Sequence, residues 1–112
     1  MIDTHAHLLP GMDDGAESTA RALAFVRQAV RQGVGVIYAT PHCCDGVYEC
    51  EKPAILKACQ ALSGAVQKEN PDIRIMPGAE IRVTHDLIDR YDAGSLLTLG
   101  NAGRFILLEL PP

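Results

Sequence analysis

The heptapeptide Val34-Gly35-Val36-Ile37-Tyr38-Ala39-Thr40 decides the fold. It is a near-continuous apolar run with several β-branched side chains, which is typical of a parallel strand buried on both faces. Pro41 ends the run, because proline has no N–H group to donate to a neighbouring strand. A buried parallel strand implies covering helices before and after it in the chain.

Two amphipathic helices flank this strand. From about Ser18 to Gln32, apolar side chains recur at helical spacing, and Gly33 is suited to the C-terminal stop. The second helix follows a polar loop that runs to about Lys52, and it ends near residues 70–71. Four apolar positions mark its buried side: Ile55, Cys59, Leu62 and Val66.

Shorter elements complete the pattern. Strands are predicted at residues 1–3, 73–76 and 104–110, and a short helix at 84–91 with Thr84 as its cap. Strands therefore alternate with helices along the chain, which implies parallel βαβ units with right-handed crossovers. The sequence predicts an α/β fold.

Composition limits the classes of protein to consider. The chain has 112 residues, 47% of them apolar and 21% charged, as expected of one soluble globular domain. A net charge of −4 argues against nucleic acid as the main partner. The apolar runs are far shorter than the roughly 18 residues that a membrane span requires. The opening residues 1–5 lack the features of a signal peptide, so we expect a cytoplasmic protein without a membrane span.

Histidines and carboxylates collect where the predicted strands end. His5 and His7 lie two positions apart just past the first strand, so in extended chain both imidazoles face the same side and can reach one metal ion. Parallel strands present their carboxyl ends at one rim, where barrels and open α/β sheets hold their sites. The second, third and fourth strands each bring one further residue to that rim: His42, Glu80 and Glu109.

Each of these residues also has an ordinary structural explanation. Glu109 interrupts an apolar strand, and a buried carboxylate there is costly unless it is paired or binds a metal. The structural alternatives are an arginine partner such as Arg82, or a position on an edge strand where Glu109 faces water. The two histidines, taken alone, suit an exposed loop. Asp13 and Asp14 precede the first helix and suit its dipole without any further role.

Several segments together carry a family resemblance. The opening Met1–Ala16 (MIDTHAHLLPGMDDGA) is similar to the first motif of the polymerase-and-histidinol-phosphatase (PHP) superfamily. More narrowly, it resembles the bacterial manganese-dependent protein-tyrosine phosphatases of capsular and exopolysaccharide operons. Four later segments match in order and at similar spacing: 39–42 (ATPH), 45–49 (DGVYE), 77–82 (PGAEIR) and 108–111 (LELP).

The resemblance implies a fold and a metal centre. The fold would be a distorted (β/α)7 TIM-like barrel, of which residues 1–112 form the N-terminal half, a partial PHP metal-dependent phosphatase domain. The cofactor would be a divalent metal, manganese in the first place, although imidazole and carboxylate ligands also suit iron and zinc. By motif position, the ligands of a trinuclear centre would include His5, His7, Asp14, His42, Glu80 and Glu109.

The resemblance also implies a reaction. The family hydrolyses phosphotyrosine on a tyrosine autokinase in polysaccharide export, by means of metal-activated water. Arg82 is the candidate catalytic residue, because its guanidinium can hold phosphate through a fork of donors. A salt bridge from Arg82 to a nearby acid is an equal alternative. Cysteine-based phosphatase chemistry is excluded, because no cysteine is followed by an arginine six positions later.

The chain departs from the family in two ways. The first is Cys43-Cys44, which stands where the family often has polar residues, commonly a second histidine. We expect all four cysteines (Cys43, Cys44, Cys50 and Cys59) to be reduced thiols. Relatives are about twice as long, and no later segment matches their His-Pro-Glu-Arg and second Asp-x-His motifs. Two alternatives therefore stay open: a truncated non-catalytic half-barrel, and another PHP phosphoesterase that acts on a small phosphate ester.

A half-barrel also has a structural consequence. Four parallel strands cannot close into a barrel, so the last strand would expose an apolar edge. Exposed apolar surface favours association. We therefore expect a homo-oligomer.

Overall fold

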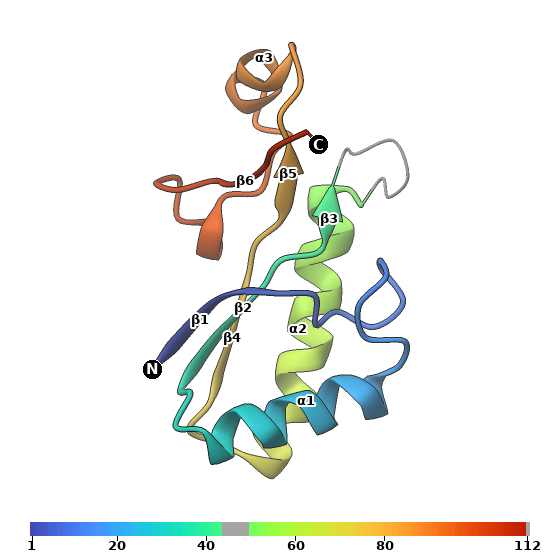
Figure 1. Ribbon diagram of the computed structural model, residues 1–112, viewed down its shortest axis with the longest axis vertical. Coiled ribbons are helices and arrows are strands. Elements are labelled where there is room, and N and C mark those ends of the chain that lie inside the picture. Colours follow the sequence, from blue (N-terminus) through green and yellow to red (C-terminus); the bar gives the residue numbers. More distant parts are fainter. Residues whose placement is uncertain (44–49, 112) are drawn as a thin grey trace.

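The computed structural model describes residues 1–43 and 50–111. The matching segment 45–49 and Cys44 lie outside the described residues. Helices and strands alternate along an elongated molecule of 41 × 26 × 25 Å (Figure 1). In chain order the elements are β1 (Ile2–Ala6), α1 (Thr19–Arg31), β2 (Val36–Ala39), β3 (His42–Cys43), α2 (Lys52–Glu69), β4 (Arg74–Pro77), β5 (Glu80–Arg82), α3 (Leu87–Asp92), the 3-10 turn η1 (Leu99–Asn101) and β6 (Leu107–Glu109).

The strands form two parallel three-stranded sheets, with orders β1-β2-β4 and β3-β5-β6. The predicted α/β fold with parallel strands is thus confirmed. The predicted strands at 34–40 and 73–76 correspond to β2 and β4, and each is followed by a further short strand, β3 or β5, that was not predicted. Pro41 lies between β2 and β3, and Gly78 lies between β4 and β5. A Cβ atom at Gly78 would lie 3.0 Å from side-chain atoms of both Thr40 and Leu99, so the chains approach closely here.

Thr40 ties the first sheet to the start of the second. Its side chain is fully buried, and its Oγ1 accepts a hydrogen bond from the Ala6 N–H at 3.0 Å. The Thr40 N–H donates in turn to the Ala6 carbonyl oxygen at 2.8 Å. The end of β1 is therefore fixed to the residue at which β2 passes into β3.

The first helix follows from its sequence. The Ser18 hydroxyl accepts a hydrogen bond from the Arg21 N–H at 3.2 Å, which caps the N-terminus of α1. After the helix, Gly33 adopts a φ of 85°, which glycine tolerates readily. The predicted range 18–32 differs from the observed helix by one residue at each end. The buried side of α1 consists of Ala22, Val26 and Ala29.

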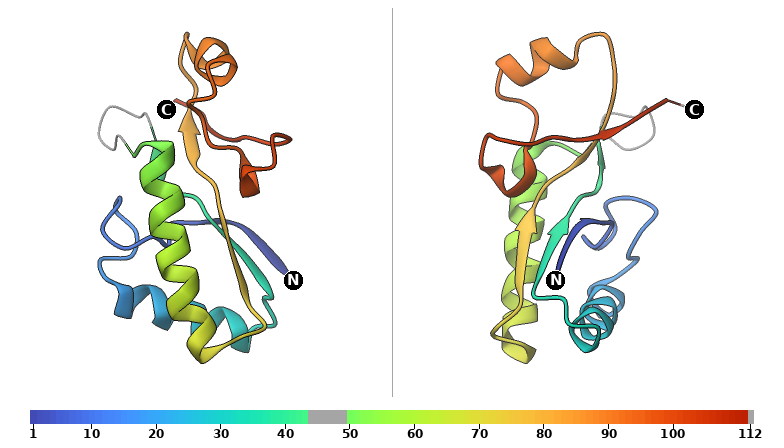
Figure 2. Two further views of the ribbon diagram at one scale, coloured as in Figure 1. Left: turned by 180° about the vertical axis from the view of Figure 1, so that it is seen from behind. Right: turned by 60° about the vertical axis from the view of Figure 1, so that its left-hand side comes forward.

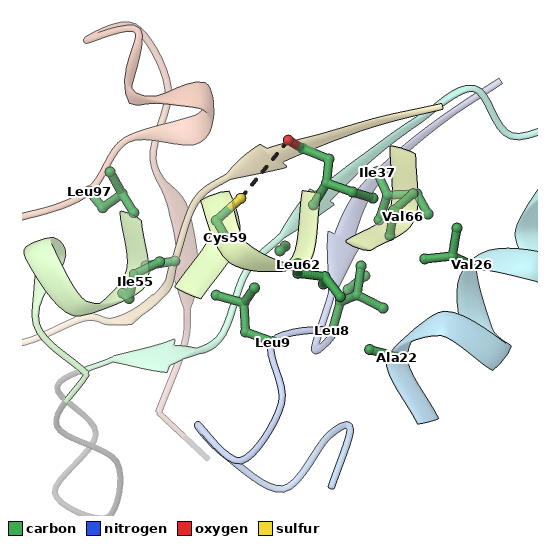
Figure 3. Packing of buried hydrophobic residues seen from close by; sticks show 14 of the residues in the cluster. Leu8, Leu9, Ala22, Val26, Ile37, Ile55, Cys59, Leu62, Val66 and Leu97 are labelled. Atoms are coloured by element: carbon green, nitrogen blue, oxygen red, sulfur yellow. Dashed lines mark hydrogen bonds between the residues drawn. The ribbon is translucent and has the colours of Figure 1, made fainter. Parts of the chain in front are cut away.

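The second helix, α2, packs against the first sheet, β1-β2-β4. Figure 2 shows α2 lying along β2 and β4, with α1 near one end of the molecule and α3 at the other. The four apolar positions predicted for its inner side are the four that are buried (Figure 3). Burial raises the pKa of the Cys59 thiol to about 11. Cys59 is a free thiol, as predicted.

Several predicted boundaries are wrong. The first strand extends to Ala6 rather than residue 3, because pairing with β2 continues past an irregularity in register. The short helix starts after Asp86, and the Thr84 hydroxyl donates to the Asp86 carboxylate at 2.6 Å instead of capping it. The last strand is limited to β6, where β5 runs beside it. The helices in the described part of the chain are too short or too polar to span a lipid bilayer.

Candidate metal centre

The two histidines of the opening motif converge at the end of β1. The Nε2 atoms of His5 and His7 lie 3.2 Å apart, as their spacing in extended chain predicts. The backbone N–H of His5 donates to the Asp3 carboxylate at 3.0 Å, which holds the strand where its register with β2 shifts. These two imidazoles are thus presented together from the first sheet.

The second sheet supplies the other ligand candidates. In its register His42 lies beside Glu80, and Arg82 lies beside Glu109. The His42 Nδ1 atom is 2.8 Å from one Glu109 oxygen and 3.3 Å from one Glu80 oxygen. Three adjacent short strands therefore bring one imidazole and two carboxylates together.

One oxygen of Glu80 is the point where the two sheets meet. Its Oε2 atom lies 3.2 Å from His5 Nε2, 3.1 Å from His7 Nε2 and 3.3 Å from His42 Nδ1. The Glu80 side chain is only 12% exposed, and this oxygen is buried without a well-directed hydrogen bond from any described residue. A buried carboxylate is costly unless a cation or donor satisfies it. Imidazole nitrogens around a carboxylate oxygen are a donor set that fits a divalent metal.

The two aspartates of the opening motif lie in different surroundings. Asp14 is 65% exposed, and its Oδ1 atom is 3.6 Å from His42 Nε2. The side chain of Asp13 is fully buried and accepts hydrogen bonds from His7 Nδ1 at 2.8 Å and from the His42 N–H at 2.9 Å. The sequence pattern indicated no role for Asp13 beyond the helix dipole. The Asp-Asp-Gly turn was the available signal, because aspartate in such turns accepts from its own backbone two residues on.

Gly15 allows this loop to fold back on His7. A Cβ atom at position 15 would lie 2.2 Å from the His7 carbonyl oxygen, so no larger residue fits without a shift. The Ala16 N–H donates to that same carbonyl oxygen at 3.1 Å, and the Gly15 N–H donates to Asp13 at 2.9 Å. The loop therefore holds His7 from the backbone as well as from the side chain.

The charges of the cluster shift three pKa values. Burial lowers the pKa of His42, but the hydrogen bond with Glu109 and the nearby carboxylates raise it above its ordinary value. Burial raises the pKa of Asp13, yet the hydrogen bonds from His42, Gly15 and His7 outweigh that effect and leave it lowered. The hydrogen bond from Arg82 lowers the pKa of Glu109. All three shifts favour the charged forms of these groups.

Arg82 reaches the cluster through Glu109. Its Nε and Nη2 atoms donate to Glu109 Oε1 at 2.9 and 2.5 Å, while the other Glu109 oxygen contacts His42. The arginine partner that the sequence offered as an alternative for Glu109 is therefore present. It coexists with the ligand cluster rather than replacing it.

The candidate ligands form three overlapping groups, and within each group the ligand atoms lie within 4.8 Å of one another. The groups are His7, Asp13, Asp14 and His42; His5, His7 and Glu80; and His42, Glu80 and Glu109. All six residues predicted as ligands fall in these groups.

A cleft of about 520 Å³ opens beside His7. Arg21 and Phe25, one turn apart on α1, contribute to its wall.

A parallel α/β fold with histidines and carboxylates gathered at the strand ends defines an α/β protein with a candidate metal centre. More particularly, the chain belongs to the capsular polysaccharide synthesis family CpsB/CapC, which it matches over residues 1–112. This confirms the family resemblance seen in the sequence.

Known relatives are similar over nearly all of this chain. It is 41% identical over 111 residues to the tyrosine-protein phosphatase YwqE of Bacillus subtilis, covering 99% of this chain and 43% of YwqE. It is 31% identical over 109 residues to the tyrosine-protein phosphatase CpsB of Streptococcus pneumoniae, covering 97% of this chain and 44% of CpsB.

A solved structure is also similar to this chain. It is one of the crystal structures of YwqE from Bacillus subtilis and CpsB from Streptococcus pneumoniae, which are described as unique metal-dependent tyrosine phosphatases. It superimposes with a TM-score of 0.91 at 40% identity, over 99% of this chain and 44% of the solved one. The chain thus spans less than half the length of the relatives it matches.

Proposed function

We propose that this chain carries part of the metal centre of a metal-dependent protein-tyrosine phosphatase. The observation that carries the proposal is the convergence of His5, His7 and His42 on one buried oxygen of Glu80. His5 and His7 lie in or just after β1 of the first sheet, whereas His42 begins β3 of the second. The cluster therefore forms only when the chain is folded. The matched relatives are named as tyrosine-protein phosphatases, which supports the reaction.

The proposed metal is manganese, as the family resemblance implies, and imidazole and carboxylate ligands also suit iron or zinc. When bound, divalent ions lower the pKa of a water molecule and offset the charge of a phosphoryl group. The chain itself orients two of the ligand side chains, because Asp13 is hydrogen-bonded to His7 and Arg82 is hydrogen-bonded to Glu109. The set of ligands is His5, His7, Asp14, His42, Glu80 and Glu109.

The proposed substrate is phosphotyrosine in a protein, in particular a tyrosine autokinase of capsule or exopolysaccharide synthesis. The cleft beside His7 is large enough for an aryl phosphate, and Phe25, which is 47% exposed, offers an aromatic wall for the ring. Arg82 is the proposed catalytic residue, adding positive charge for the phosphate through its guanidinium.

The same proposal covers architecture and assembly. Residues 1–112 would be a partial PHP domain, the first half of a distorted (β/α)7 barrel, since the chain spans under half of its relatives. Ile2 on β1 and Leu108 on β6 are 60% and 46% exposed, and such apolar strand edges favour a homo-oligomer. The free thiol of Cys59 supports a reducing compartment, the cytoplasm.

The test begins with metal content. After gel filtration in manganese, we expect one or more ions per chain for the wild type and none for the His5→Ala, Glu80→Ala double variant. The matched control is His85→Ala, Glu51→Ala, which removes an exposed histidine and an exposed glutamate outside the three ligand groups. A wild type that binds no manganese, iron or zinc would contradict the proposal.

Hydrolysis is the second stage of the test. The metal-loaded chain is incubated with a phosphotyrosine peptide, a phosphoserine peptide and a small alkyl phosphate. Release of phosphate from the first alone supports the proposed function. Release from the alkyl phosphate alone would identify another PHP phosphoesterase, and metal binding without hydrolysis would identify a non-catalytic half-barrel.

A further inference from the structure

We infer that Asp13 is a positioning residue for this centre: its one carboxylate selects the tautomer of His7 and fixes the backbone of His42. The positioning role rests on the proposed function, because it requires His7 and His42 to be metal ligands. The hydrogen bonds that carry it are present in the chain itself. It deepens the proposed function by giving Asp13, which falls in one of the three groups but is not among the proposed ligands, a positioning role beside two of them.

Both carboxylate oxygens of Asp13 accept hydrogen bonds. Oδ2 accepts from His7 Nδ1 at 2.8 Å and from the His42 N–H at 2.9 Å, while Oδ1 accepts from the Gly15 N–H at 2.9 Å. The side chain has no exposure to solvent. Three donors from three parts of the chain therefore meet one buried carboxylate.

The first consequence concerns the tautomer of His7. An ionised carboxylate can only accept, so the hydrogen of the neutral imidazole lies on Nδ1. The lone pair is then on Nε2, which is the atom that lies 3.1 Å from Glu80 Oε2 and 3.2 Å from His5 Nε2. Carboxylates that accept from the second nitrogen of a metal-binding histidine fix both tautomer and ring orientation. Asp13 thus turns the coordinating nitrogen of His7 toward the other ligands.

The second consequence concerns the distance between the two sheets. His7 follows β1 of the first sheet, whereas His42 begins β3 of the second. Because the same Oδ2 atom binds both, a shift of either residue breaks a buried hydrogen bond. The two imidazole rings also stack, with centroids 4.5 Å apart. Asp13 therefore holds ligands from both sheets in one arrangement.

Asparagine cannot replace this carboxylate. If its amide oxygen takes the place of Oδ2, its NH₂ group faces the Gly15 N–H, and two donors meet. If the amide is turned, its NH₂ group faces His7 and the His42 N–H, which drives His7 to the tautomer with hydrogen on Nε2. In either case at least one buried hydrogen bond is lost.

The experiment reads the tautomer directly, without metal or activity. The chain is labelled with ¹⁵N-histidine, and the His7 ring nitrogens are recorded at a pH well above the ordinary imidazole pKa of about 6.5. We expect the wild type to carry its hydrogen on Nδ1 and Asp13→Asn to show a substantial population with hydrogen on Nε2. A wild-type His7 with its hydrogen on Nε2 would overturn the inference, even if the variant failed to fold.

Metal affinity gives the second measurement. Calorimetry with manganese alone should show binding weakened about 10–100-fold in Asp13→Asn, which is typical when a carboxylate partner of a ligating histidine is lost. The matched control is Asp72→Asn, at an exposed turn after α2, and it should bind as the wild type does. Equal affinity and an unchanged His7 tautomer in Asp13→Asn would overturn the inference. Failure of the proposed function is distinct, since a wild type that binds no metal can still show the tautomer.

Discussion

The Nδ1 atom of His42 lies 2.8 Å from Oε2 of Glu109, although 67 positions separate the two residues in the chain. The other oxygen of Glu109 accepts both hydrogen bonds from Arg82. A carboxylate inside an apolar strand is thereby satisfied on both sides. This arrangement leaves two roles for Glu109 that experiment can separate, as a metal ligand or as an ion-pair partner.

The first prediction separates these roles. Glu109→Gln keeps the shape of the side chain but removes its charge, and we expect manganese affinity to fall by at least about tenfold if Glu109 is a ligand. Calorimetry provides the measurement, and Glu51→Gln, an exposed glutamate at the start of α2, provides the control. Unchanged affinity would show that Glu109 only pairs with Arg82.

The second prediction concerns the cleft beside His7. Removing the ring in Phe25→Ala should weaken binding of a phosphotyrosine peptide about 2–10-fold, since an aromatic pair contributes about 0.5–1.5 kcal/mol. Binding of inorganic phosphate should stay the same, because it makes no use of the ring. Titration of the metal-loaded chain with both ligands tests this. Equal losses for the two ligands would place the phosphotyrosine ring elsewhere.

The third prediction compares two glycines. Gly78→Ala would press a Cβ atom to 3.0 Å from side chains of Thr40 and Leu99, and overpacking of this kind costs about 1–3 kcal/mol of unfolding free energy. Gly64 lies exposed within α2 with open space around it, so Gly64→Ala should stabilise by about 0.5–1 kcal/mol. Urea unfolding measures both. A stabilising Gly78→Ala would show that β4 and β5 do not need this close approach.

The fourth prediction concerns pH. Arg27 on α1 donates to both oxygens of Glu69 at the end of α2, and this hydrogen bonding lowers the pKa of Glu69. A lowered carboxyl pKa contributes stability above the unfolded value of about 4.3. That contribution is lost as pH falls through the lower folded value. The difference in melting temperature between wild type and Arg27→Gln should therefore be present at pH 7 and vanish at strongly acidic pH.

Salt serves as the check on that prediction. The pair is exposed, so its effect should shrink as ionic strength rises. Arg31→Gln, at the last residue of α1, is the control, since Arg31 donates to the neutral Gln28 side chain. A pH-independent difference for Arg27→Gln would indicate that the arginine acts through packing rather than charge.

The sequence predicted the parts of the fold and site that depend on local pattern. The apolar stripe of α2 follows from helical periodicity, and the parallel order of the strands follows from their alternation with helices. The gathering of His7, His42 and Glu80 was predicted because each follows one of the first three predicted strands. The short strands β3 and β5 were not predicted, because two or three residues carry no periodic signal. Their pairing exists only through the tertiary contacts between them.

Asp13 shows the same limit at the site. Its partners are 6 and 29 positions away, so its role depends on two elements that meet only after folding. Without the family resemblance, Asp13 and Asp14 look equivalent as acids before a helix. Burial distinguishes them, since one side chain is fully covered and the other is 65% exposed.

The meeting of the two sheets at Glu80 has a thermodynamic consequence. An ion held by side chains from both sheets would act as a reversible cross-link, closing the long loops of chain between them. Binding and folding would then share one equilibrium, and each tenfold rise in free metal above its dissociation constant would raise the unfolding free energy by about 1.4 kcal/mol. The thermal stability of this chain would therefore report how much metal its surroundings provide.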